Sequence, residues 1–268
     1  MPIVIVLSVI AAAVFSALNI SSPGQLWILP VSFTVCAVGF SLLFWFLLWL
    51  CCFYIPVGRE YEKPSRFHLF LLNAAYWFMC TAAGVKIHVT GLEKLPGDKR
   101  FLFVSNHLSR FDNMTQCVAL RKYPLVFISK PSNFKIPIGR HLMTRCCYIS
   151  IDRDSPKKAV KSIMKAAELM SCGAASVGVY PEGHRGASYD LREFKAGCFK
   201  AASKSGCPVV VSTICGTEKI HKNFPFHRTH VYIDILEVAE IGSEKTTEFV
   251  TRIKSVMQKN LNKYKERD

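Results

Sequence analysis

The first 58 residues of this chain contain no Asp, Glu, Lys or Arg. Within them, residues 2–20 form one apolar run and residues 26–57 form a second, longer one. Because about 20 apolar residues cross the hydrocarbon core of a bilayer, each run is long enough to span it. Residues 19–25 (NISSPGQ) have the composition of a turn. The sequence therefore predicts an N-terminal membrane hairpin of two apolar helices over residues 1–58; a hairpin that only dips into one leaflet is the alternative.

The charges beside this hairpin predict its orientation. A secretory signal peptide normally begins with a basic segment, and no basic residue precedes the first run. Arg59, Lys63 and Arg66 follow the second run directly, whereas the turn between the runs has no basic residue. Because basic residues are enriched on the cytoplasmic side, we expect both ends of the hairpin, and the domain that follows it, to lie on the cytoplasmic face of a membrane.

Residues 59–85 form a charged linker and then a third apolar stretch, residues 67–85, interrupted by His68 and Asn73. A third span would carry the following domain to the other side of the membrane. The aromatic residues 76–78 instead suit a helix that lies at the membrane interface. A helix that packs on the following domain is the alternative interpretation.

Residues 86–268 alternate between short apolar runs and amphipathic segments, and residues 59–268 hold all 34 basic and 19 acidic side chains. Strands are expected at residues 86–90, 101–105, 125–129, 148–151, 175–180, 208–214 and 230–238. Helices are expected at residues 113–121, 135–145 and 195–205, after Ser155-Pro156, and after a Ser243 cap. The helix after Pro156 is expected to bury Val160, Ile163, Met164 and Ala167. This alternation predicts an α/β fold with a mixed, largely parallel sheet flanked by helices.

His107 and Asp112 follow the apolar run that ends at Val104. A spacing of five does not place two side chains on one helix face, so the pair would meet across a strand-to-helix turn. An Asp that binds one imidazole nitrogen leaves the other nitrogen available as a base. The alternative is an ordinary turn in which Asp112 only caps a helix, and for the pair in isolation it is the better interpretation.

A second group of polar residues follows the run that ends at Tyr180. Gly183 allows backbone N–H groups to approach a ligand, and the planar guanidinium of Arg185 suits a phosphate. A surface turn with a solvated Arg is the alternative. Because ligands of α/β sheets bind at the carboxyl ends of strands, we expect both groups to contribute to one site.

These residues resemble a known family. Asn106-His107 with Asp112 is similar to the His-(four residues)-Asp motif of the glycerolipid acyltransferases, best known in the 1-acylglycerol-3-phosphate acyltransferases. Pro181-Glu182-Gly183 with Arg185 resembles that family's Pro-Glu-Gly-Thr-Arg motif. The other motifs of the family are resembled, in order, by Lys130, Ile136-Pro137, Ile151-Asp152-Arg153, Phe194-Lys195-Ala196-Gly197 and Pro208-Val209-Val210. Departures from the pattern are Leu108 for Gln, His184 for Thr, and Val211 for a second Pro.

The resemblance implies transfer of a fatty acyl group to the free sn-2 hydroxyl of lysophosphatidic acid, which gives phosphatidic acid in phospholipid biosynthesis. The acyl donor would be acyl-coenzyme A or acyl carrier protein, and the reaction needs no metal and no organic cofactor. His107 would remove the hydroxyl proton, and Asp112 would orient His107.

The resemblance also implies roles for five substrate-binding residues. The backbone N–H near Gly183 and the side chain of Lys130 are candidates for stabilising the oxyanion. Arg153 and Arg185 would hold the acceptor phosphate. Glu182 would fix the loop or bind a glycerol hydroxyl.

Other functions remain open from the sequence. A related acyltransferase would use another lysophospholipid or glycerol 3-phosphate as acceptor, and His184 leaves the acceptor head group undecided. A hydrolase would release free fatty acid. A non-catalytic, membrane-tethered basic module would bind anionic lipid or nucleic acid, but the chain has no nucleic-acid-binding motif. We therefore expect membrane lipids, and no nucleic acid, as partners.

Overall fold

The computed structural model describes residues 2–152, 155–242 and 244–266. The chain divides into two compact units, Met1–Pro56 and Val57–Asp268.

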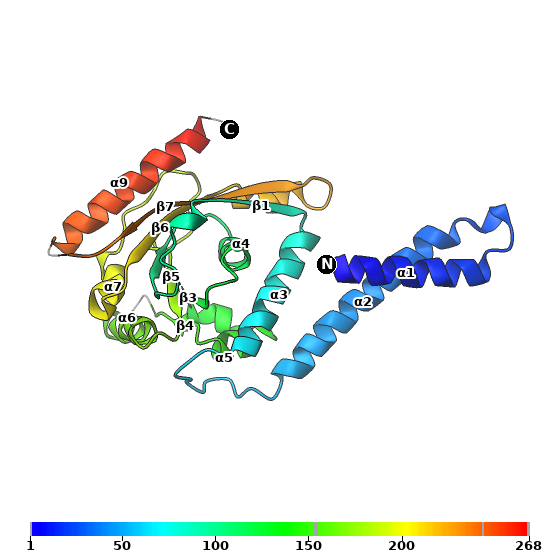
Figure 1. The fold of residues 1–268 in the computed structure, drawn as a ribbon, viewed down its shortest axis with the longest axis horizontal. Coiled ribbons are helices and arrows are strands. Elements are labelled where there is room, and N and C mark those ends of the chain that lie inside the picture. The colour runs from blue at the N-terminus through cyan, green and yellow to red at the C-terminus, as the bar shows by residue number, and fades with distance from the viewer. Residues whose placement is uncertain (1, 153–154, 243, 267–268) are drawn as a thin grey trace. The chain divides into compact units, whose positions relative to one another are not determined.

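The first unit consists of two helices that pack against each other, α1 (Pro2–Asn19) and α2 (Ile28–Cys52), joined through a 3-10 turn at Pro23–Gln25 (Figure 1). Ser8, Ala12 and Ser16 are buried and recur every fourth residue, so they form one small-residue face of α1. Small residues allow two helices to approach closely. The Oγ atoms of Ser16 and Ser32 lie 3.0 Å apart, which joins this face to α2 by a hydrogen bond.

Among the described residues, one helix, Pro23–Cys52, is long and apolar enough to cross a membrane by length and composition. The apolar helix Val6–Asn19 is shorter. The packing of α1 against α2 is therefore observed, whereas insertion of both helices as a membrane hairpin stays a prediction.

The second unit contains a seven-stranded sheet in the order β1-β7-β6-β2-β5-β3-β4. The strands are β1 (Val85–Thr90), β2 (Leu102–Val104), β3 (Leu125–Ser129), β4 (Ile149–Ser150), β5 (Ser176–Val179), β6 (Val209–Cys215) and β7 (Thr229–Ala239). All neighbouring strands are parallel except β6 and β7, which are antiparallel. Every residue of β2, β5 and β6 is buried, as expected for central parallel strands. The predicted α/β fold with a mixed, largely parallel sheet is confirmed.

Helices cover both faces of this sheet. On one side lie α3 (Arg66–Ala82) and α4 (Asp112–Ala119), and on the other lie α6 (Pro156–Ser171), α7 (Lys200–Ser205) and α9 (Thr246–Lys265) (Figure 1). The short helices α5 (Gly139–Arg145) and α8 (Ile220–Asn223) lie in connections between strands.

The third apolar stretch of the sequence is α3. Its first turn is capped by the Ser65 hydroxyl, which accepts a hydrogen bond from the His68 N–H. One face of α3, with Leu72 and Phe78, is buried against the α/β unit through α4, α5 and β1. Phe67 and Phe70 are exposed. The structure therefore shows the packed helix, and contact of α3 with a membrane interface stays a prediction.

Several helices differ from the prediction. The segment 135–145 is helical only from Gly139, because Pro137 forces the preceding residue into an extended conformation. The segment 195–205 begins with a 3-10 turn at Ala196–Phe199 and becomes α-helical at Lys200. The predicted cap Ser243 lies outside the described residues, and α9 begins at Thr246.

The predicted buried face of α6 is half wrong. Ile163 and Ala167 are buried, but Val160 and Met164 are 62% and 47% exposed. The contacts of the helix explain the difference, since the other buried residues are Ala166, Leu169 and Met170, toward its carboxyl end. The sheet and α7 therefore cover the second half of α6 more than the first half.

Candidate active site

The two polar groups predicted to share a site follow neighbouring strands. The strands β2 and β5 are parallel, and Val104 pairs with Val179. His107 and Glu182 therefore leave the sheet at the same edge. Three hydrogen bonds from backbone N–H groups join the segment after β2 to the end of β5 and the loop that follows it. They run from the His107 N–H to Glu182 Oε1 (3.1 Å), from the Gly186 N–H to the His107 carbonyl (2.7 Å), and from the Ser105 N–H to the Val179 carbonyl (3.3 Å).

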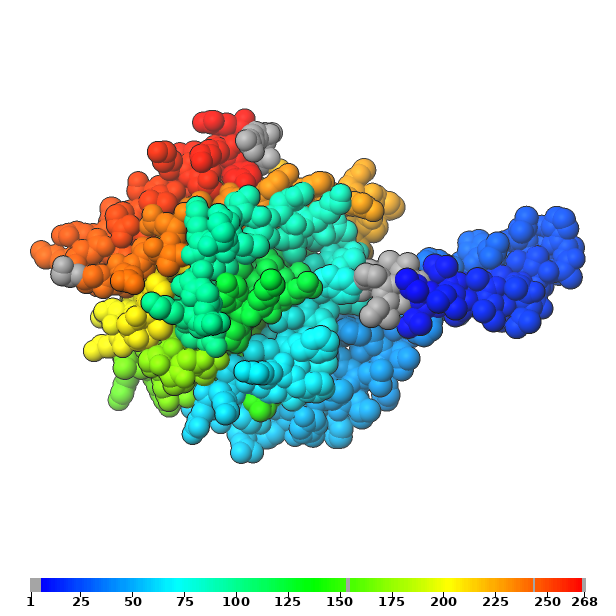
Figure 2. All heavy atoms as spheres, viewed as in Figure 1, coloured from blue at the N-terminus to red at the C-terminus, as the bar shows by residue number. Residues whose placement is uncertain are grey.

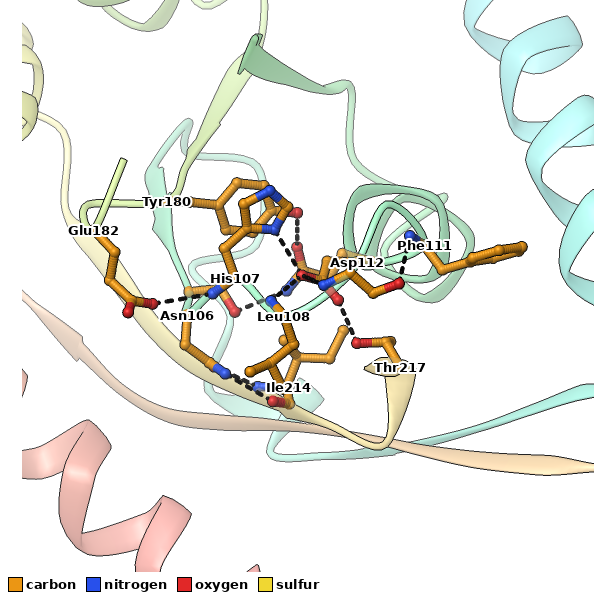
Figure 3. A network of polar contacts seen from close by, with 12 residues as sticks. Asn106, His107, Leu108, Phe111, Asp112, Tyr180, Glu182, Ile214 and Thr217 are labelled. Atoms are coloured by element: carbon orange, nitrogen blue, oxygen red, sulfur yellow. Dashed lines mark hydrogen bonds and ion pairs between the residues drawn. The ribbon is translucent and has the colours of Figure 1, made fainter. Parts of the chain in front are cut away.

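His107 and Asp112 meet across the turn between β2 and α4 (Figure 3). His107 Nδ1 lies 2.7 Å from Asp112 Oδ2. The Asp112 side chain is fully buried, whereas that of His107 is 20% exposed. A carboxylate only accepts hydrogen bonds, so it places the proton of the neutral ring on Nδ1 and leaves the lone pair on Nε2.

Asp112 is held by more than this one contact. Its Oδ2 atom also accepts the backbone N–H groups of Leu108 (2.6 Å) and Ser109 (2.9 Å). Its Oδ1 atom accepts the hydroxyl of Thr217, which follows β6. The carboxylate is therefore held both by the turn after β2 and by the segment after β6, and it fixes the position of the imidazole.

The His107 ring lies against Tyr180, the last residue before the Pro-Glu-Gly turn (Figure 3). The two ring centroids are 4.2 Å apart, with an angle of 9° between the planes. Tyr180 in turn stacks on Phe127 of β3, at 5.4 Å. Gly178 makes room for this arrangement, because a Cβ atom there would overlap the Phe127 ring.

A buried hydrogen-bond chain fixes Tyr180. Its hydroxyl donates to Gln116 Oε1 (2.8 Å), and Gln116 Nε2 donates to Ser105 Oγ (2.8 Å). Burial raises the pKa of Tyr180 well above its ordinary value, and the nearby charge of Asp112 adds to this. The phenol therefore stays neutral and keeps its role as a donor to Gln116.

Asn106 joins the site to β6. Its Nδ2 donates to the Ile214 carbonyl (2.9 Å), and its Oδ1 accepts the Ile214 N–H (2.8 Å). Both bonds are buried, so the Asn106 side chain continues the bonding to β6 two residues past the end of β2. This fixes the start of the turn from which His107 projects.

Glu182 is a buried structural acceptor in this structure. One oxygen binds the His107 N–H, and the other accepts the Arg192 N–H at 3.1 Å. Burial raises the pKa of Glu182, although the N–H groups of Arg192 and His107 oppose this effect. Glu182 therefore ties the Pro-Glu-Gly turn to both the His107 backbone and the segment before α7.

Gly183 has a φ of +75°, a conformation that favours glycine. Its own N–H donates to the Tyr180 carbonyl at 3.0 Å, so this group is engaged in the turn, and an oxyanion donor near Gly183 stays a prediction. A Cβ atom at position 183 would lie 3.1 Å from Lys195 Cε. The side chain of Lys195, absent from the predicted site, therefore lies against this turn.

The other predicted substrate-binding residues have no direct bond to the His107–Asp112 pair within the described residues. Lys130 is exposed directly after β3, and Arg185 is exposed in the loop after β5, so both lie at the site's edge of the sheet. Neither forms a hydrogen bond to the His107–Asp112 pair within the described part of the chain. Arg153 lies outside the described residues. Within the described ranges, no group of three or more His, Cys, Asp and Glu side chains has the arrangement of a metal site.

Sequence reasoning did not assign to the site four residues that support the pair: Ser105, Gln116, Tyr180 and Thr217. Gln116 and Tyr180 lie 64 residues apart, and Thr217 lies 105 residues from Asp112. Only Tyr180 had a local signal, since it is the aromatic residue at the end of a strand that immediately precedes the second motif.

Comparisons with known proteins show what the chain is similar to. The family model described as "Acyltransferase" matches residues 86–214. A 1-acyl-sn-glycerol-3-phosphate acyltransferase of Borreliella burgdorferi is 28% identical over 193 residues, which cover 69% of this chain and 76% of that protein. The corresponding enzyme of Escherichia coli is 26% identical and covers 60% and 66%.

A chloroplastic 1-acyl-sn-glycerol-3-phosphate acyltransferase of Arabidopsis thaliana is 38% identical over 136 residues, which cover 50% of this chain but only 37% of that protein. The chain thus spans less than half of this plant relative. The crystal structure of PlsC, the 1-acyl-sn-glycerophosphate acyltransferase of Thermotoga maritima, matches with a TM-score of 0.62 and 24% identity over 74% of this chain and 79% of that one, which shows a shared fold. Residues 86–214 therefore match the acyltransferase family model, and the chain is similar to the 1-acyl-sn-glycerol-3-phosphate acyltransferases.

Proposed function

We propose that this protein transfers a fatty acyl group from an acyl thioester to the free sn-2 hydroxyl of lysophosphatidic acid, and so forms phosphatidic acid. The observation that carries the proposal is the His107 Nδ1 to Asp112 Oδ2 contact of 2.7 Å, at the sheet edge that also holds the Pro-Glu-Gly turn. The relatives named for this reaction support the choice of substrate.

In the proposed mechanism, His107 is the general base. Its Nε2 atom takes the proton of the acceptor hydroxyl while the hydroxyl oxygen attacks the thioester carbonyl. The new C–O bond forms, the C–S bond breaks, and the proton passes from the imidazolium to the departing thiolate. Asp112 holds the ring in the required tautomer and stabilises the imidazolium between these two proton transfers.

The proposal assigns binding of the acceptor phosphate to Arg185 and to Arg153. A planar guanidinium binds two phosphate oxygens at once, and Arg185 is exposed in the loop that begins at the end of β5. Lys130, exposed after the neighbouring strand β3, would stabilise the oxyanion. Glu182 would act on the substrate only indirectly, because both of its oxygens already bind backbone N–H groups.

A serine nucleophile is not part of this mechanism. Ser105 is fully buried, and its hydroxyl accepts a hydrogen bond from Gln116. The Ser109 hydroxyl accepts the Phe111 N–H at 3.3 Å. We therefore propose direct attack by the acceptor without a covalent acyl-enzyme.

We also propose that the α/β unit works at the cytoplasmic face of a membrane. The apolar helix Pro23–Cys52 supports attachment to a bilayer, where a lysolipid acceptor resides. Arg59, Lys63 and Arg66 follow this helix closely, which favours a cytoplasmic location for its carboxyl end.

The test is a matched acceptor and donor series with the full chain in lipid bilayers. Lysophosphatidic acid, lysophosphatidylcholine and glycerol 3-phosphate would each be offered with a labelled long-chain acyl-coenzyme A or acyl carrier protein. Phosphatidic acid as the main product is the expected result, and the donor series separates the two thioesters. Transfer only to another acceptor would overturn the substrate assignment, and free fatty acid released without acceptor would indicate a hydrolase.

A further inference from the structure

The segment between β6 and β7, residues 217–228, begins at the edge of the sheet that holds the candidate site. Strand β6 runs parallel to β2, so its carboxyl end lies at the same edge as His107. Thr217, two residues after β6, bonds Asp112 directly. The helix α8 and a Phe-Pro-Phe sequence at residues 224–226 follow, and in Figure 2 this segment, coloured orange, projects from the surface of the α/β unit.

Two large apolar side chains lie at the end of this segment. Phe224 is 54% exposed, and Phe226 is 88% exposed, the highest value of any large apolar side chain among the described residues. Single exposed apolar residues are common on protein surfaces, but here two exposed aromatic residues lie two positions apart on one projecting loop.

The backbone of the loop is nevertheless firmly held. Ile220, the first residue of α8, is buried. The Phe224 N–H donates to the Ile220 carbonyl (3.0 Å), and the His227 N–H donates to the Asn223 carbonyl (2.8 Å). Asn223 Nδ2 donates to Thr229 Oγ1 at 3.0 Å. The aromatic pair is therefore presented by an ordered scaffold, which is how a binding surface limits the entropy cost of contact.

The charges around the aromatic pair have one sign. Two cationic side chains, Lys222 and Arg228, are exposed. Glu218 is the one acidic residue in the sequence of residues 217–230, and its Oε1 accepts the hydroxyl of Tyr189 at 2.7 Å, within the α/β unit. The projecting surface thus combines exposed aromatic rings with a cationic rim.

We propose that the loop of residues 219–228 is a second membrane contact, in which Phe224 and Phe226 enter the interface of an anionic bilayer and Lys222 and Arg228 bind lipid head groups. Aromatic side chains favour the head-group level of a bilayer, and basic residues are attracted to anionic lipid at its surface. The cationic rim favours an anionic lipid surface over a second copy of this chain, whose own loop would carry the same charge.

This contact has a consequence for the site. Because Thr217, two residues before the loop, bonds Asp112, insertion of the loop ties the bilayer surface to the strand ends that carry His107 and Asp112. A lipid acceptor could then reach the site without leaving the interface. Binding of this loop to a membrane does not depend on the proposed reaction.

Hydroxyl-radical labelling with mass spectrometry tests the inference, because it reads the solvent exposure of individual side chains. The full chain would be labelled in nanodiscs of phosphatidylcholine alone and of phosphatidylcholine with phosphatidylglycerol, at one protein copy per disc. Leu92, another exposed apolar residue, is the internal reference, since it follows the carboxyl end of β1, a strand on the other side of β7 from β6. The variant Lys222→Gln/Arg228→Gln removes the rim charges and leaves both Phe residues in place.

We expect labelling of Phe224 and Phe226, relative to Leu92, to be slower in anionic discs than in neutral ones by up to about thirtyfold, as two basic contacts imply. The double variant should lose most of this difference, and high salt should reduce it. Equal labelling in both discs would overturn the proposal. So would protection that occurs only in discs with two protein copies, which would indicate contact between chains.

Discussion

The substitution Asp112→Asn separates the charge of this residue from its place in the fold. The asparagine Oδ1 can still accept from His107 Nδ1, Leu108 N–H and Ser109 N–H, while Nδ2 faces the Thr217 hydroxyl, which can accept a hydrogen bond. We therefore expect the variant to fold with its turn intact. What it loses is the negative charge beside the imidazolium that forms during the reaction.

The size of this loss follows from the geometry. At a charge separation of about 4 Å and an effective dielectric constant of about 20, the attraction between two unit charges is about 4 kcal/mol. At about 1.4 kcal/mol for each factor of ten in rate, this corresponds to a kcat about a thousandfold lower. The His107 side chain is 20% exposed, and solvent screening lowers the expected effect toward about a hundredfold.

The assay compares kcat for acyl transfer in bilayers with the thermal unfolding midpoint of the same preparations. Thr217→Val is the matched control, since it removes one partner of Asp112 and leaves the charge; we expect it to cost about 1 kcal/mol of stability and less than about tenfold in kcat. A folded Asp112→Asn protein that keeps more than about a tenth of the original kcat would refute the electrostatic role of Asp112.

Three further substitutions test the surroundings of the pair. Gly178→Ala should destabilise the fold by about 1–3 kcal/mol, seen in the unfolding midpoint, and should lower kcat as well, because the new Cβ displaces the Phe127 ring on which Tyr180 stacks; an unchanged midpoint would contradict the stacking account. Arg185→Ala should raise the KM for the acceptor more than that for the donor, whereas Arg121→Ala, two residues past the end of α4, should change neither; equal increases for both substrates would argue against a phosphate role. Because burial raises the pKa of Glu182 in the folded state, its contribution to stability is fully present below the unfolded value and is lost as pH rises through the folded value. The stability advantage of the original protein over Glu182→Gln should therefore shrink between pH 4 and pH 7, and a growing advantage in unfolding experiments would show that the two N–H bonds outweigh burial.

Local sequence signals were enough to locate the two segments of the candidate site, which are the turns that follow β2 and β5. Short apolar runs ended by polar or turn residues gave β2 and β5, and the spacing of five between His107 and Asp112 required a turn, which the structure contains. The proximity of these two turns could be predicted because parallel strands place their carboxyl ends at one edge of the sheet.

The support of the pair could not be anticipated in the same way. The bond between Thr217 and Asp112 exists only because β6 lies next to β2, and the stack of His107, Tyr180 and Phe127 depends on β5 lying between β2 and β3. Strand order is decided by packing over the whole chain, and periodicity does not report it. The error in α6 has the same origin, since periodicity identified an apolar face but not how much of it the sheet covers.

The central claim is that the imidazole of His107 performs the proton transfer. The direct measurement is acyl transfer to lysophosphatidic acid in bilayers by the original protein and by His107→Ala, with the folded state of both checked by thermal unfolding. The account predicts phosphatidic acid from the original protein and none above background from a His107→Ala protein that unfolds at a similar temperature. Normal turnover by a well-folded His107→Ala protein would contradict it.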